Sequence, residues 1–292
     1  MSLLQSIFMG LIQGLTEFLP VSSSGHLALF KALFHVQTDT GIMFDVLLHL
    51  GTLVAVFAVY YKDIWKLICE GVSIVIDFLA NVGIAIGNLF SSRKKKYRKM
   101  VDTPYRRFVM LIIVSTIPTG IMGVLGQTLI EAASATVLVP GICLIITSIL
   151  LFISDRVKTG KKTEENASYG NALVIGVCQG FATLPGLSRS GTTITACLLS
   201  GFDRTFAVKY SFIMSIPAVL GAAVLELKDL SLATTASSEI VNYVVGMVVA
   251  AVVGYICIKT MLLVVRKKKF TIFSVYCMIV GVIAVIVGCM GL

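Results

Sequence analysis

Long apolar segments are the feature that most constrains how this chain can fold. Six of them approach or exceed the roughly 20 residues that a helix needs to cross the hydrocarbon core of a bilayer. They are Gly41–Tyr61, Phe108–Gly126, Ala135–Ile153, Phe206–Leu227, Ile240–Val265 and Thr271–Gly288. Only 13% of the residues are charged, against roughly 25% in a soluble domain. Because backbone groups in lipid must be satisfied within the segment, and the segments are too long for barrel strands, the sequence predicts an all-α integral membrane protein.

The net charge of +9 is concentrated in three clusters that lie between apolar segments, at residues 93–107, 156–162 and 266–269. In a soluble protein such runs could indicate nucleic-acid binding. Between membrane spans they are typical of cytoplasmic loops. We therefore expect membrane lipids as partners, and no nucleic acid. The seven cysteines are scattered without metal-ligand spacing, and we assign them neither a metal nor a disulfide.

The charge clusters also predict the topology. If they share one side, residues 170–202 must enter and leave the membrane there, as a re-entrant hairpin. The same reasoning makes residues 3–34 a hairpin that enters from the outer side, and residues 62–107 a cytoplasmic or interfacial insert. Residues 64–90 are apolar enough to form a seventh span instead. We favour an interfacial helix, because a span would place Lys62 and Lys66 opposite the largest basic cluster.

The two predicted hairpins resemble each other. At a constant offset of 166, six residues of the first find an identical partner in the second: Gly10, Gln13, Gly14, Ser22, Ser24 and Gly25. We infer a single membrane domain, residues 1–292, built from an inverted-topology repeat of about residues 1–130 and 170–292. In such folds, broken helices bring their N-terminal ends to a polar site near the bilayer midplane.

Charged residues inside the hairpins indicate where that site lies. Glu17 and Arg189 stand in apolar surroundings, where a charge costs roughly 2.5 kcal/mol or more unless it faces a cavity or a partner. One interpretation is that they form an ion pair with a purely structural role. However, serine-rich turns at residues 22–24 and 188–190 each precede a helix, where serine caps the helix and free amides bind phosphate. With Arg189 and His26, they predict an anion site.

The residues leave the chemistry of this site open. Ser23, Ser188, Ser190 and His26 are candidate nucleophiles, and Glu17 and His26 are candidate proton-transfer groups. Glu17 could instead hold a divalent cation that bridges phosphates. Asp45 and His49, four residues apart on one helix face, either line the same cavity or bond each other.

Two motifs carry a family resemblance. QGLTEFLPVSSSGH at residues 13–26 and PGLSRSGTT at residues 185–193 resemble the signatures of the undecaprenyl-diphosphate phosphatase (bacitracin-resistance) family. The resemblance implies hydrolysis of undecaprenyl diphosphate to undecaprenyl phosphate and inorganic phosphate, which recycles the lipid carrier for cell-wall synthesis and gives bacitracin resistance. It also implies a bacterial cell-membrane protein with an outward-facing site, and dependence on a divalent cation, Mg²⁺ or Ca²⁺.

The family's functional residues would fall here on Glu17, Ser23, His26, Ser188, Arg189 and Ser190. Gln13 departs from the family, which often has glutamate at that place, and this weakens any mechanism that needs two carboxylates. We predict catalytic roles for Glu17, Ser23, His26 and Arg189, with Glu17 as the metal ligand. We predict substrate binding by Gln13, Ser22, Ser24, Ser188, Ser190 and Thr192.

Two other classes of function fit an inverted repeat with a buried anion site. One is a membrane transporter or lipid-phosphate flippase. The other is a scaffold without chemistry, which leaves Glu17 and Arg189 without a purpose. Phosphate release in detergent separates a phosphatase from a flippase. The sequence leaves the oligomeric state open, and a homodimer is one assembly that we consider.

Overall fold

The computed structural model describes residues 2–33, 41–91, 94–134, 136–228 and 237–290. Within these ranges every regular element is a helix, apart from an isolated bridge between Lys162 and Phe202. The helices are α1 (Leu3–Phe18), α2 (Ser23–Leu33), α3 (Gly41–Phe90), α4 (Pro104–Leu125), α5 (Gln127–Ser134), α6 (Leu138–Arg156), α7 (Tyr169–Phe181), α8 (Arg189–Leu199), α9 (Arg204–Lys228), α10 (Ser237–Arg266) and α11 (Phe270–Cys289). Residue 34, where the first hairpin was predicted to end, and residue 135, where a predicted span begins, lie outside the described residues.

Six of the described helices are long and apolar enough to cross a membrane. Five of the predicted spans correspond to α4, α6, α9, α10 and α11, with ends that differ by a few residues. The remaining predicted span is the first part of α3. The predicted all-α membrane architecture is therefore confirmed.

Small residues allow the helices that carry the site to approach one another closely. α10 packs against both α1 and α3. A side chain at Gly10 would meet the carbonyl oxygen of Gly246 at 2.5 Å, and one at Gly14 would meet Cβ of Val253 at 2.8 Å. Lipid provides no hydrophobic drive between helices, so close backbone packing of this kind holds them together. It fixes the position of α1, which carries Glu17.

Four aromatic rings of the largest buried cluster join α4, the turn after α8, and α9. Phe202, Phe206 and Tyr210 contact one another with ring centroids 5.3–5.8 Å apart, and Phe108 of α4 stacks on Tyr210. Aromatic pairs at these separations stabilise a core beyond the area that they bury. The cluster thereby fixes α8, whose first residue is Arg189.

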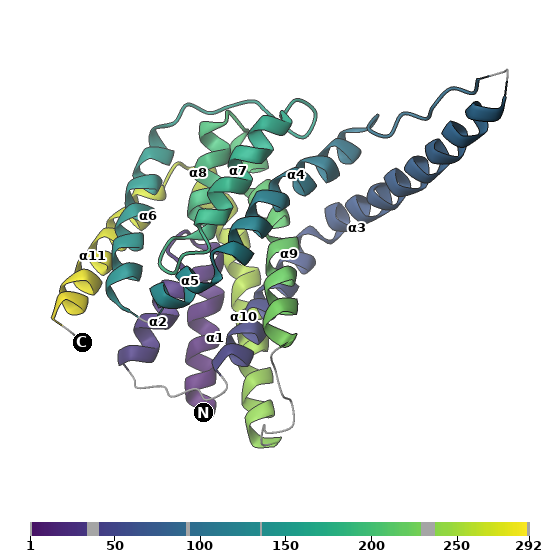
Figure 1. Ribbon diagram of the computed structural model, residues 1–292. Coiled ribbons are helices and arrows are strands. Elements are labelled where there is room, and N and C mark those ends of the chain that lie inside the picture. Colours follow the sequence, from purple (N-terminus) through teal and green to yellow (C-terminus); the bar gives the residue numbers. More distant parts are fainter. Residues whose placement is uncertain (1, 34–40, 92–93, 135, 229–236, 291–292) are drawn as a thin grey trace.

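Two helix pairs have the break that the sequence predicts. α1 ends at Phe18 and α2 begins at Ser23, while α7 ends at Phe181 and α8 begins at Arg189. α1 starts at one end of the bundle and α7 at the other (Figure 1). The internal duplication, and the depth at which either pair lies in a membrane, remain predictions.

The long helix α3 contains a kink close to the predicted end of its span. A span was predicted to end at Tyr61, followed by an interfacial helix or a seventh span within residues 64–90. In the structure, α3 consists of two helical parts that meet at Tyr60, whose angles are non-helical (φ −108°, ψ 22°). Beyond it, residues 61–90 leave the bundle as a projecting arm (Figure 1). Whether the second part lies at the interface or spans the membrane remains a prediction.

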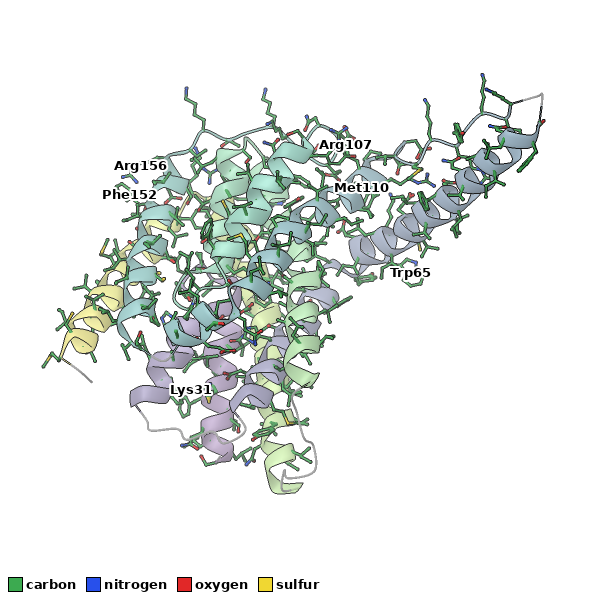
Figure 2. The ribbon with its side chains drawn as sticks, in the orientation of Figure 1. Lys31, Trp65, Arg107, Met110, Phe152 and Arg156 are labelled. Carbon is green, nitrogen blue, oxygen red and sulfur yellow. The ribbon has the colours of Figure 1, made fainter. Side chains whose placement is uncertain are left out.

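Basic side chains gather at one end of the bundle. Arg107 and Arg156 lie there, whereas Lys31 lies at the opposite end (Figure 2). Trp65, the single tryptophan of the chain, is exposed near the start of the arm.

Candidate active site

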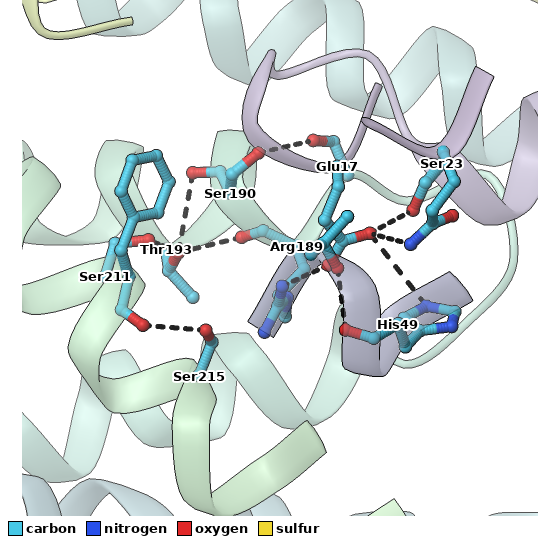
Figure 3. Close-up of polar contacts among 12 residues, drawn as sticks. Glu17, Ser23, His49, Arg189, Ser190, Thr193, Ser211 and Ser215 are labelled. Carbon is cyan, nitrogen blue, oxygen red and sulfur yellow. Dashed lines mark hydrogen bonds and ion pairs between the residues drawn. The ribbon is translucent and has the colours of Figure 1, made fainter. Parts of the chain in front are cut away.

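The structure brings Glu17 and Arg189 together, as the sequence predicted. Glu17 lies in the last turn of α1, with a side chain only 5% exposed, and Arg189 opens α8. One amino group of Arg189 (Nη2) donates a hydrogen bond to Oε1 of Glu17 (Figure 3). The other carboxylate oxygen, Oε2, accepts from Ser23 Oγ at 2.5 Å and from Gln13 Nε2 at 3.0 Å. The buried carboxylate therefore has a cation and two further donors around it, which stabilise its charged form.

The serine turns form the N-terminal ends of α2 and α8. Ser22 has a left-handed backbone (φ 71°), which is costly for a residue other than glycine and is often found at functional sites. Its hydroxyl accepts a hydrogen bond from the amide of Gly25 at 3.3 Å. Ser188 caps α8 by accepting from the amide of Gly191 at 3.1 Å. The first amides of both helices have no acceptor within their helix, so both ends suit an anion.

The two turns touch each other. The amide of Gly186 donates to Ser24 Oγ at 3.4 Å. Gly186 has φ +88°, and an added Cβ there would collide with the backbone of Pro140. An added Cβ on Gly25 would lie 3.1 Å from Cα of Gly186. Only glycine fits at position 186, and its small size lets the two serine turns share one site.

A cavity of about 230 Å³ lies beside the ion pair. Its polar wall comes from both helix pairs and from α3, and its apolar wall comes largely from small side chains of α9. The lining residues are Thr16, Glu17, Ser22, Ser23, Ser24, Val46, His49, Ala182, Thr183, Leu187, Ser188, Arg189, Ala218, Val219, Ala222 and Ala223. Thus six of the predicted residues line one cavity: Glu17, Ser22, Ser23, Ser24, Ser188 and Arg189.

The second amino group of Arg189 has no acceptor in the part of the chain that the structure describes. Its nitrogen, Nη1, is buried. A buried guanidinium donor without a partner is costly, and a ligand acceptor would satisfy it. Because the guanidinium group is planar and carries several N–H donors, Arg189 can bind Glu17 with one amino group and a phosphate oxygen with the other.

Four predicted residues lie outside the cavity lining. Gln13 contacts the site through its bond to Glu17. Ser190 Oγ lies 3.4 Å from Ser188 Oγ and 3.5 Å from the carbonyl oxygen of Leu19. Thr192 Oγ1 is buried, without a partner in the described part of the chain.

His26, the fourth of these residues, is held elsewhere. Its Nδ1 lies 2.8 Å from the carbonyl oxygen of Ser22, and its Nε2 lies 2.7 Å from the hydroxyl of Tyr276 in α11. The two rings stack, with centroids 5.5 Å apart. In this arrangement both nitrogens of His26 have partners, and the ring supports the turn that carries Ser23.

The histidine at the cavity is His49. Its Nε2 lies 3.9 Å from Oε2 of Glu17, and its Nδ1 lies 2.8 Å from the backbone oxygen of Asp45 (Figure 3). Of the two alternatives for Asp45 and His49, cavity lining applies to His49 alone, because the Asp45 carboxylate pairs with Lys31 at 2.5 Å. The spacing of four residues indicated a shared helix face, but only the fold places that face beside Glu17.

A second row of hydroxyls supports Arg189. Thr193 Oγ1 donates to the carbonyl oxygen of Arg189 at 2.8 Å and lies 2.6 Å from Ser211 Oγ of α9 (Figure 3). These bonds join the first turn of α8 to α9. They hold the backbone of Arg189 in place, and sequence motifs alone did not indicate Ser211.

The cavity offers few ligands for a metal. Glu17 is the single carboxylate among the described residues that line it, and both of its oxygens already accept hydrogen bonds. Gln13, at the place where the resembling family often has a second glutamate, is neutral. Among the described residues, no group of three or more His, Cys, Asp or Glu side chains could hold a metal. One neutralised carboxylate does not form a protein-held site for Mg²⁺ or Ca²⁺, which prefer several oxygen ligands.

Comparisons with known proteins agree with the motifs. A family model described as "Bacitracin resistance protein BacA" matches residues 6–283. A protein of Methanosphaera stadtmanae named "Undecaprenyl-diphosphatase" is 40% identical over 288 residues, which cover 99% of each chain. A protein of the same name from Halothermothrix orenii is 38% identical, over 99% of each chain. Another, from Methanobrevibacter smithii, is 40% identical, over 97% of this chain and 96% of its own. The chain therefore belongs to the bacitracin resistance protein BacA family.

Proposed function

We propose that this protein hydrolyses undecaprenyl diphosphate to undecaprenyl phosphate and inorganic phosphate, and so recycles the lipid carrier for cell-wall synthesis and gives bacitracin resistance. The curated relatives bear the name of this activity. The observation that carries the proposal is the arrangement in the cavity. The hydroxyl of Ser23 donates a hydrogen bond to Glu17, and Nη1 of the neighbouring Arg189 is a buried donor without a partner among the described residues.

The terminal phosphate of the substrate binds to Arg189 Nη1 and to the first amides of α2 and α8. Arg189 stabilises the charge that spreads over the phosphoryl oxygens in the transition state. The apolar wall from α9 accommodates the start of the isoprenyl tail, and the remainder of the tail lies in the surrounding lipid. The hydrogen bond from Arg189 to Glu17 fixes the guanidinium plane in advance, so little ordering is needed when substrate binds.

Ser23 is the nucleophile in this mechanism. Its hydroxyl donates to Glu17 at 2.5 Å, so Glu17 takes the proton as Ser23 Oγ forms a bond to phosphorus. The bond between that phosphorus and the bridging oxygen breaks, and undecaprenyl phosphate leaves with the electron pair. Water then attacks the phosphoserine, its oxygen forms inorganic phosphate, and Ser23 Oγ recovers a proton from Glu17. The alternative is direct attack on the phosphorus by a water molecule that Glu17 binds. Replacement of Ser23 distinguishes these two mechanisms.

The two histidines have different roles in this proposal. His49, 3.9 Å from Glu17, shares the proton that the carboxylate accepts. His26 positions the Ser22–Ser23 turn through its bond to the Ser22 carbonyl. A direct proton-transfer role for His26, as the sequence suggested, requires its Nε2 to leave Tyr276.

Any divalent cation enters with the diphosphate rather than as a resident of the protein. The phosphate oxygens supply most of its ligands, and Glu17 is the protein carboxylate that the cation could approach. When bound, the cation neutralises charge on the diphosphate. The residues of the chain perform every step above without it.

We also propose the setting of the enzyme. The protein spans the bacterial cell membrane several times, with the basic end in the cytoplasm and the cavity open to the outer face, since basic loops remain inside. The two helix pairs are re-entrant halves of an inverted repeat, and the enzyme acts as a monomer or a homodimer.

The experiment is phosphate release from a long-chain isoprenyl diphosphate by purified protein in detergent, with Ser23→Ala as the comparison. Steady release by the wild type, lost in the variant, supports a serine phosphatase. A flippase predicts no release, because it moves the lipid without cleaving the phosphoanhydride bond. Absence of release by wild-type protein shown to be folded would refute the proposed function.

A further inference from the structure

The arm, residues 61–90 of α3, has a polar face that is occupied by the chain itself. Arg106 of α4 donates to Glu70 and Asp77, and further along the arm Asn81 and Asn88 follow at helical spacing. Intervals of seven, four and seven residues place Glu70, Asp77, Asn81 and Asn88 on one face of the helix.

Two asparagines fasten the basic segment that returns along this face, residues 94–103, which we call the strap. The Asn81 amide accepts from the backbone N–H of Arg98 at 2.7 Å and donates to its carbonyl at 2.9 Å. Asn88 pairs in the same way with Lys95, at 2.7 and 3.0 Å. Each amide thereby satisfies both backbone groups of one strap residue, so the strap is held at two points along the helix.

The strap carries exposed positive charge. Arg98 bonds to Asp77. Four lysines of the strap are exposed and form no ion pair with any described residue: Lys94, Lys95, Lys96 and Lys99. A groove of about 410 Å³ lies between strap and helix, lined in part by Lys95, Arg98 and the side-chain-free surfaces of Gly83 and Gly87. This groove has room for an anionic headgroup.

The opposite face of the arm is apolar and uncovered. Seven apolar side chains on this face are between 54% and 87% exposed: Val72, Val75, Ile76, Leu79, Ile86, Leu89 and Phe90. An apolar stripe of this length does not face water in a stable protein. The strap rules out burial of the whole arm in hydrocarbon, because its lysines run beside residues 81–88 and would enter with it.

We propose that the arm lies on the bilayer surface, with its apolar face at the acyl-chain boundary and its strap bound to anionic phospholipid headgroups. A helix that lies in the membrane interface needs one apolar face and one polar or charged face, and the arm has both. The exposed lysines of the strap make anionic lipid the preferred surface. Thirty residues of helix extend for roughly 45 Å, so the arm reaches lipid well away from the bundle. The proposal concerns the arm alone and does not rest on the phosphatase activity.

The test uses full-length protein in vesicles at low protein density. Trp65 is the single tryptophan, so the double variant W65F/L89W carries one fluorophore at the tip of the arm. Quenching by brominated acyl chains is measured in phosphatidylcholine vesicles and in vesicles that also contain phosphatidylglycerol. We expect quenching in both, stronger by at least about twofold with phosphatidylglycerol, and a loss of that difference at high salt.

Two matched triple variants are made in this background. K94Q/K95Q/K96Q removes three charges from the strap, and K267Q/K268Q/K269Q removes three exposed lysines between α10 and α11. The first abolishes the difference between the two lipid compositions, and the second preserves it. The salt measurement needs no strap variant, so the proposal can be tested even if K94Q/K95Q/K96Q fails to fold.

Three results would overturn the proposal. An unquenched L89W fluorophore in both vesicles places the apolar face away from lipid, as docking against another protein or a second copy would do. Equal quenching in both compositions removes the recognition of anionic headgroups. An equal effect of the two lysine variants assigns the preference to total charge rather than to the strap.

Discussion

Replacement of Arg189 by alanine separates the catalytic use of the ion pair from its structural use. R189A removes the donor to Glu17 Oε1 and the buried free donor Nη1. Glu17 keeps its hydrogen bonds from Ser23 and Gln13 but loses the neutralising charge. Both activity and stability should therefore fall, for different reasons.

The magnitudes follow from the geometry. Removal of one preorganised donor to developing charge costs roughly 10²–10³-fold in kcat. Removal of one partner from a fully buried pair costs about 3–5 kcal/mol of stability. Arg189 is 22% exposed and Glu17 keeps two donors, so we expect ~2 kcal/mol here.

The assay combines phosphate release with thermal unfolding in detergent, for R189A, E17Q/R189A and the control R156A. E17Q/R189A should regain much of the lost stability, because a neutral amide needs no counter-charge, while activity remains lost. R156A, at an exposed arginine, should leave both unchanged. Turnover of R189A within about threefold of the wild type would remove Arg189 from the mechanism. A double variant less stable than R189A would refute the reasoning about the carboxylate.

Four further outcomes are expected. S23A lowers kcat by at least about 100-fold with little change in KM, measured by phosphate release, and a decrease under about tenfold would favour direct attack by water. H49Q lowers kcat by about tenfold, because the proton on Glu17 loses an acceptor, and an unchanged rate would exclude His49. Q13E places a second carboxylate beside Glu17, so added Mg²⁺ or Ca²⁺ should raise the unfolding temperature of this variant and not of the wild type. G186A forces a side chain into the backbone of α6 at φ +88° and should cost about 1–3 kcal/mol in strain alone, seen as a lower unfolding temperature.

Local features of the sequence predicted the helices and much of the cavity. Hydrophobic length fixes where α4, α6, α9, α10 and α11 lie, because lipid leaves the backbone no alternative to a helix. The position of the serine turns was predictable, because the free amides at the start of a helix need a side-chain cap and serine supplies it. The pairing of Glu17 with Arg189 followed from the cost of burying either charge alone.

Other contacts between distant segments were not predictable from the sequence. His26 and Tyr276 are 250 residues apart, and no motif links them. The proximity of His49 to Glu17 depends on how α3 crosses α1. The amide clamps of Asn81 and Asn88 bind backbone atoms, which leave no signature in the sequence of the strap.

The separation of the ion pair along the chain has a consequence for biogenesis. Glu17 precedes Arg189 by 172 residues. At ~5–20 residues per second, a ribosome makes Glu17 roughly 10–30 s before its partner. Throughout that interval α1 carries a carboxylate whose counter-charge does not yet exist, so full entry into lipid is unfavourable. α1 should therefore settle only after α8 has been made, and a nascent chain arrested before α8 should leave α1 accessible to water-soluble reagents.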